Sequence, residues 1–145
     1  MCTDFTDEQL GLTSPGTYGT VADTFLHMLG AEQGYLQRLG VGPSLITRET
    51  QFPGIGELKT HAARSGDQLI ALAEKADPDD AIEAKFDDGD YRVQSGVVLI
   101  QALHHGNDHR THICTILGHH GLTYGDMDVW AYGDATGAIV PIGAS

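Results

Sequence analysis

Two histidines, His105 and His109, stand four positions apart in a stretch whose pattern predicts a helix. On a helix this spacing places both imidazoles on one face, with Cβ atoms about 5–6 Å apart. Two rings at that separation can bind one transition-metal ion. A third histidine, His27, lies on an earlier apolar-periodic segment and can complete the set. The three residues are therefore candidate ligands of a divalent metal ion.

The spacing leaves a second interpretation open, in which the two histidines are half-buried and hydrogen-bonded to carboxylates. Eight histidines placed at random among 145 residues give about 0.4 such pairs. If a metal binds, three imidazoles leave one position open for water or a substrate, as in catalytic zinc sites. Imidazole also suits nickel, copper and iron, so the ligands alone do not fix the ion.

An open site of this kind supports two chemistries. The ion can lower the pKa of water for hydrolysis, or it can bind a thiol as the thiolate nucleophile. Helical metalloproteases carry a glutamate directly after the first histidine, and Gly106 stands at that position here. Asp108 could replace that glutamate as the general base, but on a helix its side chain projects about 100° away from His109. Glu32 and Asp23 remain as bases or as supports for His27, with a solvated helix face as the alternative for each.

Three amphipathic helices are expected to position these residues. The first expected helix begins after a cap at Thr17 or Thr20 and ends near Leu39. The second runs from about 56 to 75, and the third runs from about 96 to 119 with Ser95 as its cap. The acidic segment 79–93 predicts a turn at 87–90 between short strands at 82–86 and 91–93. Three long helices and little strand predict an all-α fold of the bundle type.

The composition describes one globular domain spanning residues 1–145, with 41% hydrophobic and 19% charged residues. The formal net charge of −12 argues against nucleic acid and anionic membranes as partners, because both bind basic surfaces. No apolar run is long enough to span a bilayer. Two distant cysteines, Cys2 and Cys114, make no disulfide framework. We therefore expect a cytoplasmic protein with a small-molecule substrate.

The remaining candidates have weaker cases. His104 and His112 lie off the face of the histidine pair, as surface or supporting residues. Arg110 can orient an anionic substrate or form a plain salt bridge. The other residues are expected to be structural or exposed: His61 alone in the second helix, His119 and His120 at a helix end where a cation suits the dipole, and Cys114 in the core.

Three segments resemble the DinB-like superfamily, which includes the YfiT-type and thiol-dependent maleylpyruvate isomerase groups. Residues 24–32 resemble the helix that bears the family's first ligand, with Tyr35 where an aromatic residue is usual. Residues 105–110 resemble its second motif, in which the first and fifth residues bind metal and an arginine follows. Residues 128–133 resemble its C-terminal segment. The segments occur in the expected order across residues 17–133.

This resemblance implies a four-helix bundle with a divalent-metal site held by His27, His105 and His109, often in a homodimer. Family members include S-transferases and isomerases that use mycothiol, bacillithiol or glutathione, and DNA binding is not implied. For this chain the resemblance favours a zinc- or nickel-dependent thiol S-transferase acting on a small electrophile. Glu32 and Arg110 would be its supporting catalytic residues. A metal-dependent hydrolase and a non-catalytic metal-binding dimer are the alternatives.

Two features depart from the family pattern. Thr111 and His112 replace the usual Gly-Gln after the arginine. Only about 16 residues precede the helix that carries His27, too few for the family's first long helix. Either this helix is lacking or the start of the sequence is misassigned, and for the sequence as given we expect an N-terminally shortened bundle with a short acidic loop or hairpin between helices. Such a bundle would expose an apolar groove along the helices at 21–39 and 96–119, which we expect a partner chain, or helices re-paired across a dimer, to cover.

Overall fold

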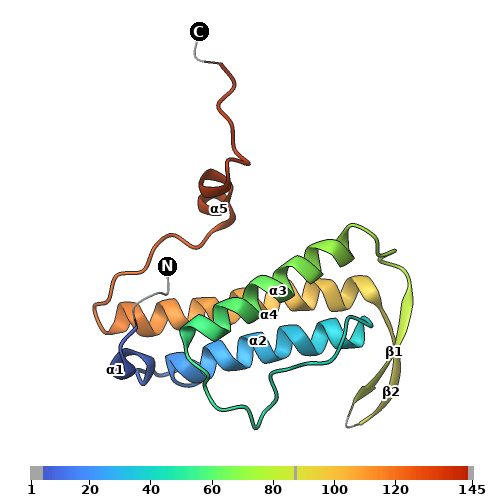
Figure 1. The fold of residues 1–145 in the computed structure, drawn as a ribbon, viewed down its shortest axis with the longest axis horizontal. Coiled ribbons are helices and arrows are strands. Elements are labelled where there is room, and N and C mark those ends of the chain that lie inside the picture. Colours follow the sequence, from blue (N-terminus) through green and yellow to red (C-terminus); the bar gives the residue numbers. More distant parts are fainter. Residues whose placement is uncertain (1–4, 87, 144–145) are drawn as a thin grey trace.

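The computed structural model describes residues 5–86 and 88–143, which form five helices and one β-hairpin (Figure 1). The long helices are α2 (Val21–Arg38), α3 (Ile55–Ala73) and α4 (Ser95–His119). The short helices are α1 (Asp7–Leu10) and α5 (Val129–Thr136). Strands β1 (Ala81–Phe86) and β2 (Gly89–Gln94) connect α3 to α4. Cys2 and Asp87, the latter part of the predicted turn, lie outside the described residues.

Helix α2 begins after one of the two predicted caps, Thr20. The hydroxyl oxygen of Thr20 accepts from the backbone N–H of Asp23 (3.1 Å), and the Asp23 carboxylate accepts from the backbone N–H of Thr20 (3.3 Å). This capping box satisfies donors that have no partner within the helix. It therefore fixes the start of the helix that carries His27. The chain leaves the helix through Gly40, whose φ of 81° favours glycine.

The predicted cap of α4 is wrong. The N-cap residue is Gln94, which makes no side-chain capping bond. Ser95 is instead the first helical residue and is 5% exposed. Its hydroxyl donates to the carbonyl of Asp77 (2.7 Å), and its N–H donates to the carbonyl of Asp80 (2.7 Å). The serine thus ties the start of α4 to the connection between α3 and β1.

Helix α2 packs against both other long helices. The cluster that joins it to α4 consists of Val21, Ile113, Ile116 and Leu117. The cluster that joins it to α3 and to the intervening loop consists of Leu29, Ile46 and Leu58. Each large apolar side chain buried in this way contributes about 1.5–3 kcal/mol. The two clusters flank His27 along α2, so they fix the part of the helix that carries it.

The acidic segment forms the predicted hairpin, with β1 antiparallel to β2 and Ala84 opposite Tyr91. Ala84 is 3% exposed, and β2 packs against α4. The all-α prediction is therefore correct only in part, because a small sheet joins a mostly helical fold. The hairpin matters for function because its residues form one end of a cavity.

A fourth long helix is not found among the described residues, since α1 has four residues and α5 has eight. Helix α5 stands apart from the other helices (Figure 1). Helix α5 is not among the three helices expected from the sequence. Asp128 accepts from the N–H of Ala131 (2.7 Å) at its start, and Gly137 with a φ of 70° ends it. No helix in the described part of the chain is long and apolar enough to cross a membrane.

Candidate metal centre

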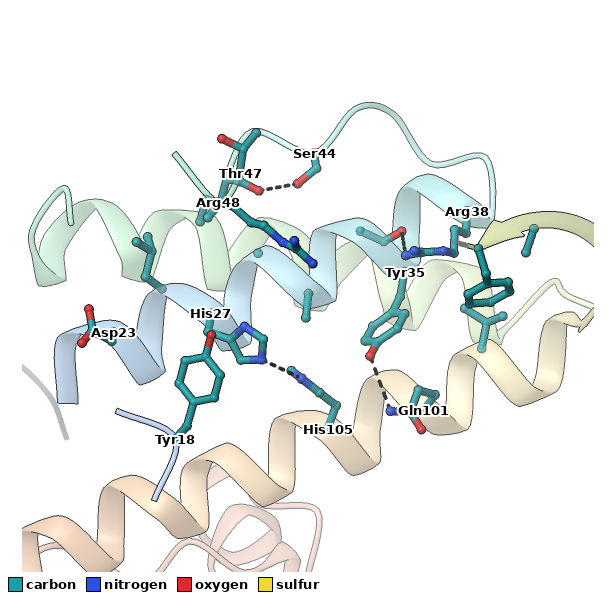
Figure 2. Close-up of a pocket in the computed structure, with 18 of the residues that line it drawn as sticks. Tyr18, Asp23, His27, Tyr35, Arg38, Ser44, Thr47, Arg48, Gln101 and His105 are labelled. Carbon is teal, nitrogen blue, oxygen red and sulfur yellow. Dashed lines mark hydrogen bonds between the residues drawn. The ribbon is translucent and has the colours of Figure 1, made fainter. Parts of the chain in front are cut away.

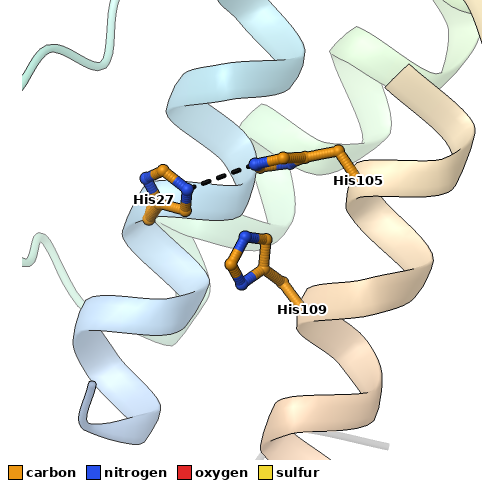
Figure 3. A group of neighbouring side chains, drawn as sticks. All are labelled: His27, His105 and His109. Carbon is orange, nitrogen blue, oxygen red and sulfur yellow. Dashed lines mark hydrogen bonds between the residues drawn. The ribbon is translucent and has the colours of Figure 1, made fainter. Parts of the chain in front are cut away.

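The three predicted ligands meet between α2 and α4 (Figure 3). His27 lies on α2, and His105 and His109 lie on successive turns of α4. One ring nitrogen of each residue lies within 4.8 Å of those of the other two. The Nε2 atoms of His27 and His105 are 3.2 Å apart. The fold thus brings the pair with i, i+4 spacing together with His27, the candidate third ligand.

This arrangement fits a divalent ion. Zn–N bonds of about 2.0–2.1 Å at tetrahedral angles place neighbouring ligand nitrogens about 3.3 Å apart. The Nε2 atoms of His27 and His105 already have nearly that separation. The ring of His109 lies at 80° to the ring of His27 and at 61° to the ring of His105. Three rings that approach from different directions can share one ion, whereas three stacked rings cannot.

The surroundings keep the three imidazoles neutral. Burial is the largest cause that lowers the pKa of each histidine. Repulsion by His105 lowers the pKa of His27 further, and Arg48 adds to the effect. Burial together with His105 and His27 lowers the pKa of His109 to about 4. Because metal binds neutral imidazole, the site is ready for a metal ion at neutral pH.

Two neighbouring rings support the ligands. Nδ1 of His112 lies 3.3 Å from Nδ1 of His109, which leaves Nε2 of His109 for the ion. The ring of Tyr18 stacks on His27, with centroids 4.0 Å apart and planes at 15°. Metal-binding histidines are usually oriented by a partner on the second ring nitrogen. His112 therefore lies where it can orient the ring of His109, which is the supporting role considered for it from the sequence.

A cavity of about 1240 Å³ opens beside His27 and His105 (Figure 2). Its wall comes from α2, the loop 39–54, the hairpin and the first half of α4. Near its centre the amide of Gln101 donates to the hydroxyl of Tyr35 (3.5 Å). The hairpin end is apolar and includes Phe86, Val93 and Val97. A molecule in this cavity would lie next to the open side of the histidine cluster.

Tyr18 and Arg48 are among the residues of the cavity wall that sequence reasoning did not single out. Both lie in segments without apolar periodicity, one before α2 and the other between α2 and α3. Their side chains reach the site through tertiary contacts, which no local pattern records. For Arg48 the available signal was its charge, because the chain contains only eight lysines and arginines.

Glu32 and Arg110, the predicted catalytic residues, do not line the cavity. The hydroxyl of Ser65 on α3 donates to the carboxylate of Glu32. Burial raises the pKa of Glu32, and Ser65 and Arg110 partly oppose that rise. Arg110 lies over Gly106, where a Cβ atom would be 3.2 Å from its Nη1. Their catalytic role stays a prediction, and their positions favour support of the helices behind the ligands.

The other candidates lie outside the cluster. The carboxylate of Asp23 accepts a hydrogen bond from the hydroxyl of Thr20 (2.7 Å). Oδ2 of Asp108 lies 3.7 Å from Nδ1 of His104, and both side chains are exposed. The remaining residues are placed as follows: His61 beside Gln33, His119 and His120 at the end of α4, and Cys114 beside Met127. None of these joins the three-histidine group.

Comparison with known proteins identifies the family of the chain. The sequence pattern of the DinB family matches residues 1–141, a range that contains all three histidines. A search of curated proteins finds no match. The family match covers nearly the whole chain and therefore stands on more than the two histidine segments. The chain belongs to the DinB family.

Proposed function

We propose that this protein is a divalent-metal enzyme that transfers a low-molecular-weight thiol to a small electrophile. The observation that carries the proposal is the meeting of three neutral imidazoles beside a large cavity. Among the described residues, no fourth histidine, cysteine or carboxylate joins this group. A closed structural site would need that fourth ligand, whereas three ligands suit a site that binds a reactant. Zinc and nickel are the proposed ions.

Each part of the site has a role in this proposal. A bound ion would supply an open coordination position at which a thiol loses its proton and becomes a nucleophile. His27, His105 and His109 would hold the ion. The hydroxyl of Tyr35 and the amide of Gln101 would orient polar groups of the molecules that enter the cavity. A thiol of the mycothiol, bacillithiol or glutathione type is the proposed second substrate.

The carboxylates favour thiol transfer over hydrolysis. Helical metalloproteases add a general base near the metal-bound water that attacks. Asp108 is exposed beside His104, and Glu32 accepts from Ser65 on the neighbouring helix. Gly106 stands where helical metalloproteases carry their glutamate. A free thiol is far more acidic than water, so on a bound ion it would release its proton to solvent more readily without a protein base, and these placements therefore support the thiol reaction.

Activity assays with zinc- or nickel-loaded protein test the proposal. We expect conjugation of monochlorobimane with glutathione, bacillithiol or mycothiol to run at least about tenfold faster than with His105→Ala protein treated in the same way. The reaction without protein gives the background rate. A control with His104→Ala, a neighbouring histidine outside the cluster, should retain the wild-type rate.

Two results would contradict thiol transfer. Hydrolysis of p-nitrophenyl acetate without any thiol, lost in His105→Ala, would identify a metal-dependent hydrolase. Stoichiometric metal binding without turnover in either assay would identify a non-catalytic metal-binding protein.

We also propose a homodimer that covers the exposed face of α4. Ile100 and Leu103 are 69% and 68% exposed on neighbouring turns, and exposed apolar patches often mark interfaces. Replacing both with glutamate is expected to convert a dimer to a monomer in light scattering without changing the circular dichroism spectrum. Ile70→Glu, at an exposed position of α3, is the matched control. A wild-type protein that is monomeric in the same experiment would contradict the proposal.

A further inference from the structure

The cavity presents positive charge in an otherwise acidic protein. The chain has 20 acidic residues against 8 lysines and arginines. Two of the eight, Arg38 and Arg48, line the cavity. The acidic residue among the described residues of the wall is Asp23, whose carboxylate binds Thr20 in the capping box of α2. The local charge of the cavity is therefore opposite to the net charge of the chain and attracts anions.

Arg48 is the cation that is available to a ligand. Figure 2 shows its guanidinium reaching from the loop toward the space between His27 and Tyr35. It makes no hydrogen bond or ion pair with another described residue. Arg38, by contrast, donates to the carbonyl of Gly34 (3.2 Å) and lies over the ring of Phe86. The donors of Arg48 thus remain free to bind a carboxylate, for which the geometry of guanidinium is suited.

The loop that carries Arg48 is fixed on α2. The side-chain carbonyl of Gln33 accepts from the backbone N–H groups of Leu45 (2.8 Å) and Ile46 (3.1 Å). Ile46 is 4% exposed and belongs to the core cluster between α2 and α3. Gly30 permits this close approach, because a Cβ there would lie 3.1 Å from Cγ2 of Ile46. The backbone of the arginine is therefore held beside the cavity by buried contacts.

The opposite end of the cavity has a different character. Phe86 and Val93 of the hairpin and Val97 of α4 form an apolar wall. We propose that the cavity binds a small organic acid, with its carboxylate on Arg48 and its ring-sized apolar body against this wall. Such a ligand uses both the free donors and the apolar surface of one cavity.

This inference rests on the proposed function in one respect, namely that the bound acid would be the electrophile that receives the thiol. The carboxylate that binds Arg48 could instead belong to the thiol substrate. The apolar wall favours the electrophile, because mycothiol, bacillithiol and glutathione are polar molecules. A binding test without metal or reactive thiol separates failure of this inference from failure of the transferase proposal.

The probes are 2-naphthoate and its uncharged analogue 2-naphthamide, titrated into metal-free protein and followed by amide chemical shifts in nuclear magnetic resonance. We expect shifts in residues 44–48, in the hairpin and in the first half of α4. Arg48→Gln is expected to weaken 2-naphthoate binding about fivefold and 2-naphthamide binding by less than about twofold. Arg64→Gln, an exposed arginine of α3 outside the cavity wall, should change neither by more than about twofold.

Three outcomes would overturn the inference. In the first, 2-naphthoate binds wild type and Arg48→Gln equally. In the second, Arg64→Gln weakens binding as much as Arg48→Gln does, or the shifts lie outside the cavity wall. In the third, S-methylglutathione binds in an Arg48-dependent manner whereas 2-naphthoate does not bind. That result would assign the anion subsite to the thiol instead of the electrophile.

Discussion

Replacing His105 with alanine is expected to remove bound zinc or nickel from the purified protein. His105 is close to both other ligands, because its Nε2 lies 3.2 Å from Nε2 of His27 and its ring centroid lies 4.4 Å from that of His109. Without it, two imidazoles on different helices remain, and two ligands bind a borderline ion weakly. Elemental mass spectrometry on tag-free protein would measure the loss directly.

The size of the effect can be bounded. Removing a hydrogen-bond partner of a metal-binding histidine typically weakens metal binding by about 10–100-fold. Removing a ligand should exceed this, so we expect His105→Ala to weaken zinc binding by more than about a hundredfold in competition with a chelating indicator. The matched control is His104→Ala, which removes the preceding histidine of the same helix. Its side chain is exposed beside Asp108 and outside the cluster.

The supporting ring gives a graded version of this test. His112→Phe keeps an aromatic ring next to His109 but removes the Nδ1 atom of residue 112, which lies 3.3 Å from Nδ1 of His109. We expect zinc binding to weaken by about tenfold, between the effects of the control and of the ligand variant. Equal metal content in wild type and His105→Ala, even after reconstitution, would mean that the three histidines are a packed polar cluster without a metal.

The parts of the site that the sequence predicted are those fixed by local chemistry. The i, i+4 spacing of His105 and His109 places both rings on one face of any helix. Thr20 is one of the two caps expected from the sequence, and its reciprocal bonds with Asp23, three residues later, make it the start of α2. The placement of His27 opposite the pair needed more than periodicity, and the family resemblance supplied that information.

The parts that were missed depend on contacts between distant segments. Ser95 was predicted to be a cap, but its hydroxyl instead donates a hydrogen bond to the carbonyl of Asp77, 18 residues earlier. Arg48 faces the cavity because Gln33, on the preceding helix, binds the backbone of its loop. A sequence pattern read one segment at a time contains neither partner. The positions of such side chains are settled only when the segments pack.

Helix α5 was not among the expected helices, although the residues that begin and end it are typical of helix caps. Asp128 is a good capping residue and Gly137 a good terminator, and both act in those roles. The helix has only eight residues, and Val129 and Trp130 are 82% and 74% exposed. Its apolar residues therefore do not mark a buried face, and the periodicity on which helix prediction depends is lacking.

Acid is expected to destabilise the metal-free protein between about pH 6.5 and about pH 4, chiefly through His109. Burial, followed by the charges of His105 and His27, lowers the pKa of His109 from 6.5 to about 4. In this window the unfolded chain binds a proton at this residue and the folded chain does not, so falling pH favours unfolding. A tenfold change in proton affinity corresponds to ~1.36 kcal/mol, which gives about 3 kcal/mol at the acid end.

Urea unfolding of metal-free protein at about pH 7 and about pH 5 would measure this dependence. We expect wild type to lose about 2 kcal/mol from His109 between the two, and His109→Gln to lose less than half as much. His104→Gln, outside the cluster, should behave like wild type. Burial raises the pKa of Glu32, which has the opposite sign because stability is then lost as the pH rises. Glu32→Gln should therefore enlarge the loss at low pH, and equal losses in all variants would show that the site residues do not set the acid response.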